Sequence, residues 1–307
     1  MTQLNMSEST QKMSDSPKND VLSEFLTKLN ISAKIFALPS LCGEWQINTT
    51  GVSPAQFHLV SRGSCYLHMR HLGAPVPLRA GDLIAVMHGD WHVISGGPEL
   101  NGDEGLYPND AKGPFTALVC GQFEFSERAR KLLLSLLPPL IVVHPADAGD
   151  QFATIMRLLT DEGQRKLQGS EVVMDKLSDA LFVMLLRHYL LTVDKPSGIL
   201  AGLTDEKLSK AISAMHKNPG ANWTLSLLAD IAGMSRTAFA EKFTQLVAQT
   251  PVAYLSEYRM QEAERMMSDP KNSVKLIADS LGYATEAAFR KAFKRIAGFN
   301  AGQLRRK

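Results

Sequence analysis

One stretch decides how the last third of this 307-residue chain folds: Trp223-Thr-Leu-Ser-Leu-Leu-Ala-Asp-Ile-Ala-Gly-Met-Ser-Arg-Thr-Ala-Phe-Ala-Glu-Lys-Phe243. Apolar residues at three- and four-residue spacing predict one buried face of a short helix: Leu225, Leu228, Ala229 and Ala232. Gly233 follows, where a glycine in the left-handed conformation ends a helix, and Ser235 is placed to cap another. The stretch therefore predicts helix, turn, helix.

The second of these helices has two distinct faces. Its predicted inward residues are Ala238, Phe239 and Phe243. Its outward residues are small or able to form hydrogen bonds: Arg236, Thr237, Ala240 and Glu241. An outward face of this kind is typical of a helix that enters the major groove of DNA.

The same pattern returns about fifty residues later, from Ser273 to Arg295. Its predicted inward residues are Leu276, Ile277, Ser280, Leu281, Phe289 and Phe293. Gly282 is the matching turn and Thr285 the matching cap. The predicted outward residues are Glu286, Ala287, Arg290 and Lys291. An ordinary helical domain with a solvated outer face is the alternative, but turn glycines before small and basic outward residues favour two DNA-reading motifs.

A helix from Val252 to Ser268 is predicted to join the two copies. Its length is roughly 25 Å at 1.5 Å per residue. With its end loops it places the two outward helices about one DNA turn apart, near 34 Å. One chain is therefore expected to read two successive major-groove segments.

Three motifs make this region similar to the AraC/XylS family of transcription regulators: Ser235-Arg-x-x-Phe239, Thr250-Pro-x-x-Tyr-Leu255 and Ile277-Ala-x-x-x-Gly-Tyr283. The resemblance covers Glu206 to Arg306 and implies a double helix-turn-helix domain that binds promoter DNA. RNA polymerase would be a further partner if the chain is an activator. Glu241, Ala301 and Leu304 depart from the family pattern.

Charge is divided unevenly along the chain. Residues 204–307 carry 16 Lys and Arg against 10 Asp and Glu, whereas the remainder carries 17 against 21, so the whole chain is only +2. The positive excess therefore falls in the region predicted to meet phosphates.

Nothing in the sequence predicts export or a membrane anchor. Residues 1–20 are polar and are expected to form a disordered tail rather than a signal peptide. No apolar run is long and uninterrupted enough to span a bilayer. Three cysteines, an odd number, argue against a secreted disulfide scaffold and for the cytoplasm.

Residues 21–126 are predicted to form a β domain. After a short amphipathic helix from Val21 to Leu29, short apolar runs alternate with turn residues between Ala33 and Phe125, which indicates a sandwich or barrel. Gly97 to Pro114 is expected to be a mobile surface loop.

Gly81-Asp82, followed by an apolar strand and Gly89-Asp-Trp91-His92, resembles the second motif of the cupin fold, a jelly-roll barrel. Three further stretches resemble AraC-type regulators with such a domain: Leu41-Cys-Gly-Glu-Trp45, Phe57-His58 and Val119-Cys-Gly-Gln-Phe123. Val60 stands where metal-binding cupins have a second histidine, and their glutamate is absent. The resemblance implies the degenerate cupin that serves as the sensory half of AraC-type regulators, and it is strongest to the reactive-chlorine-responsive subgroup. The expected fold class is therefore α+β with two domains: an N-terminal cupin-like jelly-roll barrel with a helical segment, and an all-α double helix-turn-helix domain at 204–307.

Residues 127–203 are predicted to be helical, with an apolar stripe wider than one helix needs. The stripe is expected either to pack on the barrel or to form a homodimer interface, as the family commonly has. The linker is expected within Asp194 to Gly202.

Two constellations are candidate sensor sites. His58 and His92 are either satisfied barrel histidines or metal ligands, with zinc as the candidate cofactor. Cys42 and Cys120 resemble the subgroup's sensing cysteines, and the alternative is two buried hydrophobic residues. A jelly roll could bring the two cysteines to the same end, where a disulfide needs Cα atoms within about 7 Å, and a Cys2His2 zinc site becomes possible if all four groups converge. Cys65 is expected only to pack.

The leading function is a non-enzymatic transcription regulator whose barrel senses an oxidant or a small-molecule effector. The alternative is a metal-dependent cupin enzyme, an isomerase or dioxygenase, with an appended helical domain. The missing histidine and glutamate weigh against that enzyme.

Overall fold

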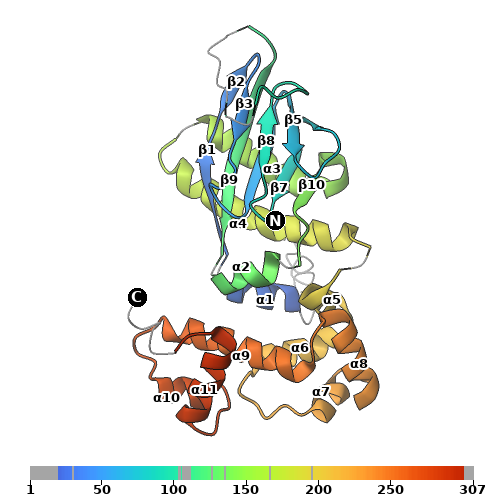
Figure 1. Ribbon diagram of the computed structural model, residues 1–307, viewed down its shortest axis with the longest axis vertical. Coiled ribbons are helices and arrows are strands. Elements are labelled where there is room, and N and C mark those ends of the chain that lie inside the picture. Colours follow the sequence, from blue (N-terminus) through green and yellow to red (C-terminus); the bar gives the residue numbers. More distant parts are fainter. Residues whose placement is uncertain are drawn as a thin grey trace, which may run out of the picture. The chain divides into compact units, whose positions relative to one another are not determined.

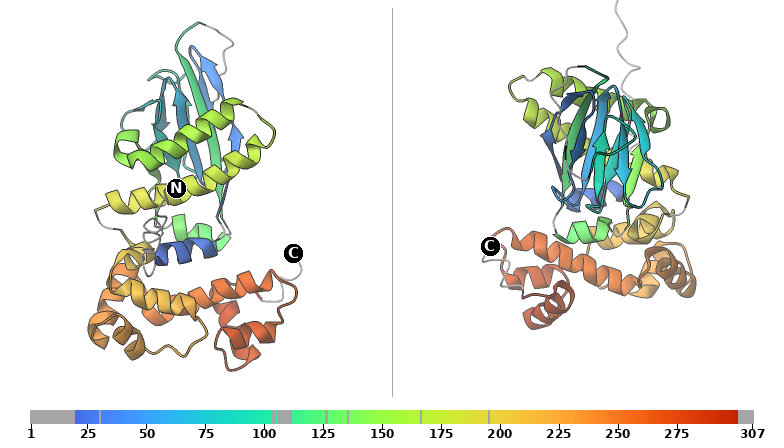
Figure 2. Two further views of the ribbon diagram at one scale, coloured as in Figure 1. Left: turned by 180° about the vertical axis from the view of Figure 1, so that it is seen from behind. Right: turned by 45° about the horizontal axis from the view of Figure 1, so that its top comes forward.

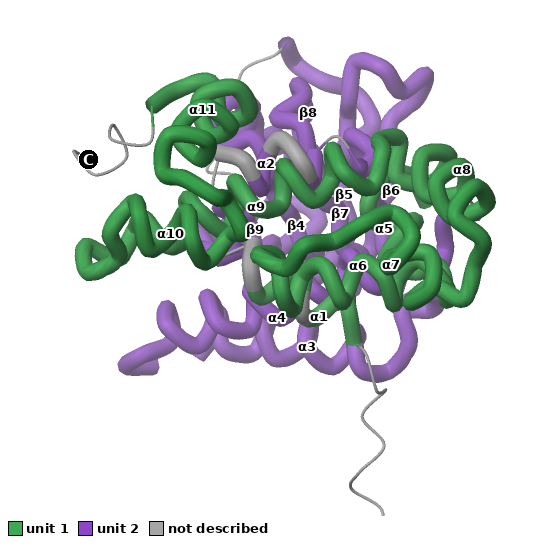
Figure 3. The backbone as a smooth tube through the Cα atoms, turned by 90° about the horizontal axis from the view of Figure 1, so that it is seen from below, with its two compact units in different colours: residues 1–28, 195–307 green, residues 29–194 purple. Residues whose placement is uncertain are grey.

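The computed structural model describes residues 20–29, 31–102, 105, 112–125, 127–134, 136–165, 167–194 and 196–300. The predicted tail up to residue 19, much of the predicted mobile loop at 97–114, and residues 301–307 lie outside the described residues. Two compact units make up the chain (Figure 3). Residues 29–194 form the β unit, and residues 195–307 together with 1–28 form the helical unit.

The β unit contains two antiparallel sheets (Figure 1). Its described strands are β1 (Ser32–Ala37), β2 (Ser40–Cys42), β3 (Gln46–Asn48), β4 (Gln56–Arg62), β5 (Ser64–Met69), β6 (Val76–Arg79), β7 (Leu83–Val86), β8 (His92–Ser95), β9 (Phe115–Glu124) and β10 (Leu140–Val143). The larger sheet has the order β1-β9-β4-β7-β10, with β2 also paired to β9, and the smaller has the order β3-β8-β5-β6.

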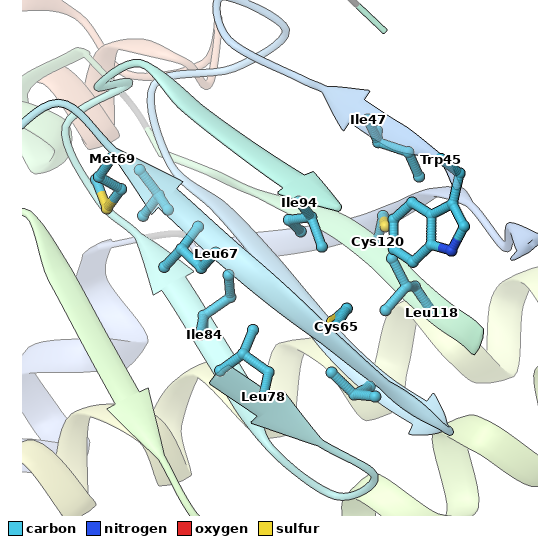
Figure 4. Close-up of a cluster of buried hydrophobic side chains, with 12 residues drawn as sticks. Trp45, Ile47, Cys65, Leu67, Met69, Leu78, Ile84, Ile94, Leu118 and Cys120 are labelled. Atoms are coloured by element: carbon cyan, nitrogen blue, oxygen red, sulfur yellow. The ribbon is translucent and has the colours of Figure 1, made fainter. Parts of the chain in front are cut away.

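Side chains from both sheets meet in one hydrophobic core (Figure 4). Successive side chains of a strand point to opposite faces of the sheet, so only every second residue points into this core. On β4, Val60 lies in this core, whereas Phe57 stacks on Phe123 and lies on the opposite face of the sheet. Phe123 in turn contacts Phe182 of a covering helix at a ring distance of 4.8 Å. The larger sheet is therefore buried on both faces.

Three helices accompany the sheets: α2 (Glu127–Leu134), α3 (Pro145–Arg165) and α4 (Ser170–Thr192). Helices α3 and α4 pack against the larger sheet, as Figure 2 shows, which is one of the two uses expected of the apolar stripe. The prediction of helix throughout 127–203 is wrong at Leu140–Val143, which is strand β10. The pair Pro138-Pro139 ends the preceding helix, and the β-branched run pairs with β7.

Carboxylates of α4 cover the open edge of the larger sheet at β1. Asp179 accepts a hydrogen bond from the backbone N–H of Ala33 at 2.7 Å, and Asp175 accepts one from Ile35 at 3.3 Å. Residues two apart on a strand present N–H groups to the same edge, and residues four apart on a helix lie on one face. The two spacings match, so the outward backbone N–H groups of Ala33 and Ile35 both have an acceptor on α4.

The helical unit contains α1 (Val21–Leu29), α5 (Gly198–Thr204), α6 (Leu208–Lys217), α7 (Leu225–Ile231), α8 (Arg236–Val247), α9 (Pro251–Met267), α10 (Val274–Ser280) and α11 (Glu286–Ala297). Helix α1 forms as predicted, but the structure groups it with this unit rather than with the strands, because Phe25 stacks on His216 of α6. The predicted linker is largely helix α5. Gly202 there packs closely against Ile212 and Val247, so this segment belongs to the core of the unit.

Both helix-turn-helix motifs form with the predicted local geometry. Gly233 and Gly282 have φ angles of 62° and 74°, the left-handed conformation expected at both turns. Ser235 accepts a hydrogen bond from the Ala238 backbone at 3.3 Å, and Thr285 accepts one from Ala288 at 3.1 Å. The inward faces need three corrections: Ala238, Leu276 and Ser280 are exposed. Each of the three is followed directly by a buried residue, so each lies at the edge of the inward face.

Candidate DNA-reading surface and sensor site

Helix α8 presents the side chains predicted to read DNA in the first motif. Phe239, Phe243 and Val247 are buried and anchor the helix. Arg236, Thr237 and Glu241 are exposed and Ala240 is half-buried, so the predicted outward face is accessible.

Glu241 is an unusual residue on such a face. Its neighbour Lys242 is engaged elsewhere, because Lys242 Nζ lies 2.5 Å from Asp205 Oδ2. Among the described residues, no cation pairs with the Glu241 carboxylate. Helix α8 therefore presents one unpaired carboxylate, Glu241, and one exposed cation, Arg236, a charge balance that does not favour phosphate contacts.

Helix α11 occupies the equivalent position in the second motif, and its charge is different. Phe289 and Phe293 are buried, whereas Ala287, Arg290 and Lys291 are exposed and Glu286 is half-buried. Lys294 and Arg295 are also exposed and were not predicted as site residues. The signal was present in the sequence, since each follows Arg290 or Lys291 by one helical turn. This concentration of cations suits phosphate contacts.

Helix α9 joins the two motifs as predicted, with 17 residues from Pro251 to Met267. Thr250 caps it through a hydrogen bond from the Ala253 backbone at 3.2 Å, and Pro251 occupies the first turn. Such a helix is roughly 25 Å long. Its length agrees with the spacing needed to place α8 and α11 in successive major-groove segments.

His58 and His92 come together inside the β unit. Their Nε2 atoms are 3.3 Å apart, and Thr49 Oγ1 lies 2.8 Å from His92 Nε2. His92 Nδ1 donates to the carbonyl oxygen of Asp90 at 2.8 Å, so in neutral His92 the Nε2 atom is the acceptor. Among the described groups, none bonds to the buried His58 Nδ1 atom. Sequence reasoning missed Thr49, which no motif marks.

Both imidazoles are held neutral at pH 7. Complete burial, with a smaller effect of the neighbouring His92, lowers the pKa of His58 to about 3. Burial likewise lowers the pKa of His92, and the Asp90 backbone opposes that shift in part. The pair is therefore a desolvated polar contact within an apolar core.

The residues present do not fit a tetrahedral zinc ion. Zinc in proteins takes four ligands, or three with a water. Within the described ranges, no group of three or more His, Cys, Asp and Glu residues is placed to hold a metal. The expected Cys2His2 site is not formed, because Cys42 lies far from the two histidines.

The strand register separates the two candidate sensing cysteines. Cys120 lies opposite His58 in the β4–β9 pair, whereas Cys42 lies opposite Phe115 in the β2–β9 pair. The distance from Phe115 to Cys120 along β9 puts the two cysteine Cα atoms about 17 Å apart, beyond the roughly 7 Å that a disulfide spans. The expectation that they meet at one end of the barrel is therefore wrong for this structure.

The three thiols differ in exposure and acidity. Cys42 is half-buried, whereas Cys65 and Cys120 are buried. Burial, with a smaller effect of Asp82, raises the pKa of Cys65 to about 12. Burial also raises the pKa of Cys120, with a smaller contribution from Cys65. Cys65 packs in the core, as expected, and Cys120 packs beside it (Figure 4).

The fold and the two exposed helices define a class: a transcription regulator with a cupin-like domain and a double helix-turn-helix domain. A family model described as cupin matches residues 20–191, and one described as helix-turn-helix domain matches residues 228–307. Within the described residues, no helix is both long and apolar enough to cross a membrane.

Curated relatives match along nearly the whole chain. A putative AraC-like transcription regulator of Streptomyces antibioticus is 30% identical over 302 residues, covering 94% of this chain and 98% of that protein. One of the same description from Streptomyces lividans is 29% identical over 303 residues, with the same coverage. The RCS-specific transcriptional activator RclR of Escherichia coli K12 is 28% identical over 270 residues, covering 86% of this chain and 89% of RclR.

The chain belongs to the AraC-like family of transcription regulators. Its relatives are named as transcription regulators and the chain itself matches a helix-turn-helix domain model, so the chain is a regulator and not an enzyme. For the alternative of a metal-dependent isomerase or dioxygenase, the residues that the structure describes place no further His, Cys, Asp or Glu beside His58 and His92 to complete a metal site.

Proposed function

We propose that this regulator binds promoter DNA by inserting α8 and α11 into two successive major-groove segments. The single observation that carries the proposal is the repeat of one capped, glycine-turned motif within one unit, joined by the 17-residue helix α9. The proposed reading residues are Arg236, Thr237, Ala240 and Glu241 on α8, and Glu286, Ala287, Arg290 and Lys291 on α11.

Selection of binding sites from random DNA, followed by footprinting, tests this proposal. The selected sequence should contain two half-sites about 10 base pairs apart on one face of the duplex. Inserting five base pairs between them turns one half-site to the opposite face and should reduce binding to the non-specific level. Tolerance of that insertion would contradict simultaneous reading by α8 and α11.

We further propose that the β unit senses an oxidant through Cys42 or Cys120. Two observations support this: the half-buried position of Cys42, and similarity to a relative whose name describes an RCS-specific activator. Because the two thiols lie far apart, the proposed chemistry is oxidation of a single cysteine rather than a bond between them. Cys42 is expected to react first, because burial keeps Cys120 protonated.

A small-molecule effector is the second candidate, favoured by a cavity of about 660 Å³ in the β unit. It lies between strands β1 and β9 and helices α3 and α4, and its lining mixes apolar and charged groups such as Met174, Lys34 and Glu171. A Thr160→Leu replacement would reduce this volume. That variant would assign effector sensing to the cavity if it lost the transcriptional response to the effector and kept the transcriptional response to hypochlorite that depends on Cys42.

We propose that the protein acts in the cytoplasm and that it contacts RNA polymerase if it activates transcription.

We also propose that the chain forms a homodimer. Exposed apolar side chains of the α3–α4 region support the dimer: Leu158, Leu167, Val172, Val173 and Leu191. Sedimentation of the native protein and of a Val172→Glu, Val173→Glu variant tests it. A native protein that sediments as a monomer at micromolar concentration would exclude this interface.

A further inference from the structure

The two helix-turn-helix motifs touch each other at a point remote in sequence from the helix that joins them. Gly220 lies in the loop that leads into α7, and Gly282 lies in the turn between α10 and α11. A Cβ atom on Gly220 would collide with the carbonyl oxygen of Ser280, and one on Gly282 would collide with the carbonyl oxygen of Gly220. The backbones are therefore in direct contact, and side chains are excluded at both positions.

Arg259 of α9 contacts both sides of this junction. Its Nε donates to the carbonyl oxygen of Pro219 at 2.7 Å, and its Nη2 donates to that of Ala221 at 2.9 Å. The guanidinium carbon also lies 5.8 Å from the centre of the ring of Tyr283, the residue that follows Gly282. One side chain thus binds the carbonyls on either side of Gly220 and packs on the turn that Gly220 touches.

This arrangement gives the two motifs a second connection. Helix α9 already packs into the core of each motif, through Tyr254 against Phe243 and through Met260 in the core that holds Phe289 and Phe293. The Gly220–Gly282 contact, with Arg259 holding the loop, adds a direct contact between the motifs. Packing on α9 alone leaves each motif able to tilt about that helix, whereas the added contact restricts this tilt.

We propose that Arg259 is a positioning residue that sets the separation and orientation of α8 and α11. Its guanidinium is suited to this task because its planar fork reaches two carbonyl oxygens at once, which an ammonium group does not do in the same geometry. The consequence for operator spacing rests on the proposed function, whereas the fixed geometry of the two motifs does not.

Pulsed electron spin measurements on the full chain without DNA test the geometry. Spin labels are placed at Thr244 and Lys294, exposed residues at equivalent positions of α8 and α11, in a Cys42→Ser background that leaves only the buried cysteines. The label distance should be narrowly distributed in the parent. In Arg259→Gln the distribution should widen at least about twofold, because one motif is released from the other.

Arg265→Gln is the matched control. Arg265 lies on the same helix, is exposed and pairs with Glu262 of that helix at 2.9 Å, so its replacement removes an equal charge without touching the junction. It should keep the narrow distribution. A distribution in Arg259→Gln as narrow as in Arg265→Gln would overturn the proposal.

Gly220→Ala gives a second, independent perturbation should Arg259→Gln fail to fold. Gly220 does not need a left-handed conformation, so the added methyl group acts only through the collision with Ser280. The mean label distance should then shift. An unchanged mean in a folded Gly220→Ala protein would also contradict the proposal.

Operator variants with half-sites 9, 10 and 11 base pairs apart extend the test to DNA. The preference of the parent for its best spacing should fall about tenfold in Arg259→Gln, the equivalent of one charge-assisted hydrogen bond, and stay unchanged in Arg265→Gln. The ratio of the affinities at two spacings is not changed by a phosphate contact of either arginine, because such a contact contributes equally at each spacing. Failure of the parent to select any DNA would reject the proposed function, while the distance measurement would still decide the role of Arg259.

Discussion

Arg290 and Glu286 form an ion pair one turn apart on α11, with 2.6 Å between Nη2 and Oε1. Both side chains lie on the face proposed to meet DNA, so the pair occupies the guanidinium that would bind a guanine. If Arg290 binds a guanine through two parallel hydrogen bonds, its guanidinium must first leave the Glu286 carboxylate. Glu286 is therefore expected to oppose binding to the wrong sequence.

Arg290→Ala should weaken binding to the selected operator by about 1–3 kcal/mol if Arg290 pairs with a guanine. Titration of operators altered at single positions in the second half-site distinguishes the modes of contact. A guanine contact predicts that the variant loses discrimination at one position. An equal loss on all sequences would assign Arg290 to phosphate, and unchanged affinity at moderate salt would remove it from the interface.

Glu286→Gln should act in the opposite direction by releasing Arg290 and removing a negative charge. We expect affinity for random DNA to rise, by about 0.3–1 kcal/mol, with a smaller gain on the operator. Competition binding with operator and random duplexes measures both. Lower affinity for random DNA would show that Glu286 does not restrain Arg290.

Glu241 on α8 should read a cytosine in the first half-site, because a carboxylate accepts from the cytosine amino group in the major groove. Glu241→Ala should relax the base preference at one position, at a cost of about 1–3 kcal/mol on the best operator. Site selection with the variant measures the preference, and Glu206→Ala, at an exposed position in the turn between α5 and α6, is a charge-matched control. An unchanged selected sequence would exclude Glu241 from base reading.

Low pH should destabilise the β unit through the buried histidines. The folded-state pKa of His58 is about 3, below its ordinary value of about 6.5, so the unfolded state binds the extra proton and stability falls as pH drops below about 6.5. For His58 alone the loss between pH 7.5 and pH 5 is about 2 kcal/mol. Urea unfolding at both pH values should show a smaller loss in His58→Gln. Exposed His71→Gln is the control, and equal pH sensitivity of both variants would contradict this role for His58.

A reporter driven by the native promoter tests oxidant sensing. Cys42→Ser should reduce the hypochlorite response most, Cys120→Ser less, and Cys65→Ser least, because burial raises the pKa values of Cys120 and Cys65 and keeps both thiols protonated. Protein abundance must be measured in parallel, because the two inner positions lie in the core. An unchanged response in both Cys42→Ser and Cys120→Ser would reject oxidant sensing and leave the small-molecule effector.

Local patterns were sufficient to predict the two helix-turn-helix motifs. The caps at Ser235 and Thr285 and the turns at Gly233 and Gly282 depend on residues within five positions of each other, so sequence alone encodes them. The outward faces followed from helical periodicity. Errors such as Ala238 occurred at the boundary of a face, where a shift of one residue changes burial.

Local patterns could not predict which strands pair. Whether the run at Leu140–Val143 forms a strand depends on β7, more than fifty residues earlier, and an apolar run of four residues fits either a helix or a strand. The separation of Cys42 and Cys120 likewise depends on the register of β2 on β9. The contact between Gly220 and Gly282 was missed for the same reason, since no periodicity reports it.

The carboxylates of α4 that cover β1 have a consequence for synthesis on the ribosome. Asp179 follows Ala33 by 146 residues, so the edge of β1 emerges long before the helix that closes it. At ordinary translation rates that interval is on the order of ten seconds. In its later part, after β9 has been made and can pair with β1, the nascent sheet carries an open strand edge of the kind that pairs with other chains. A nascent chain halted before α4 is therefore the species most exposed to aggregation and most in need of a chaperone.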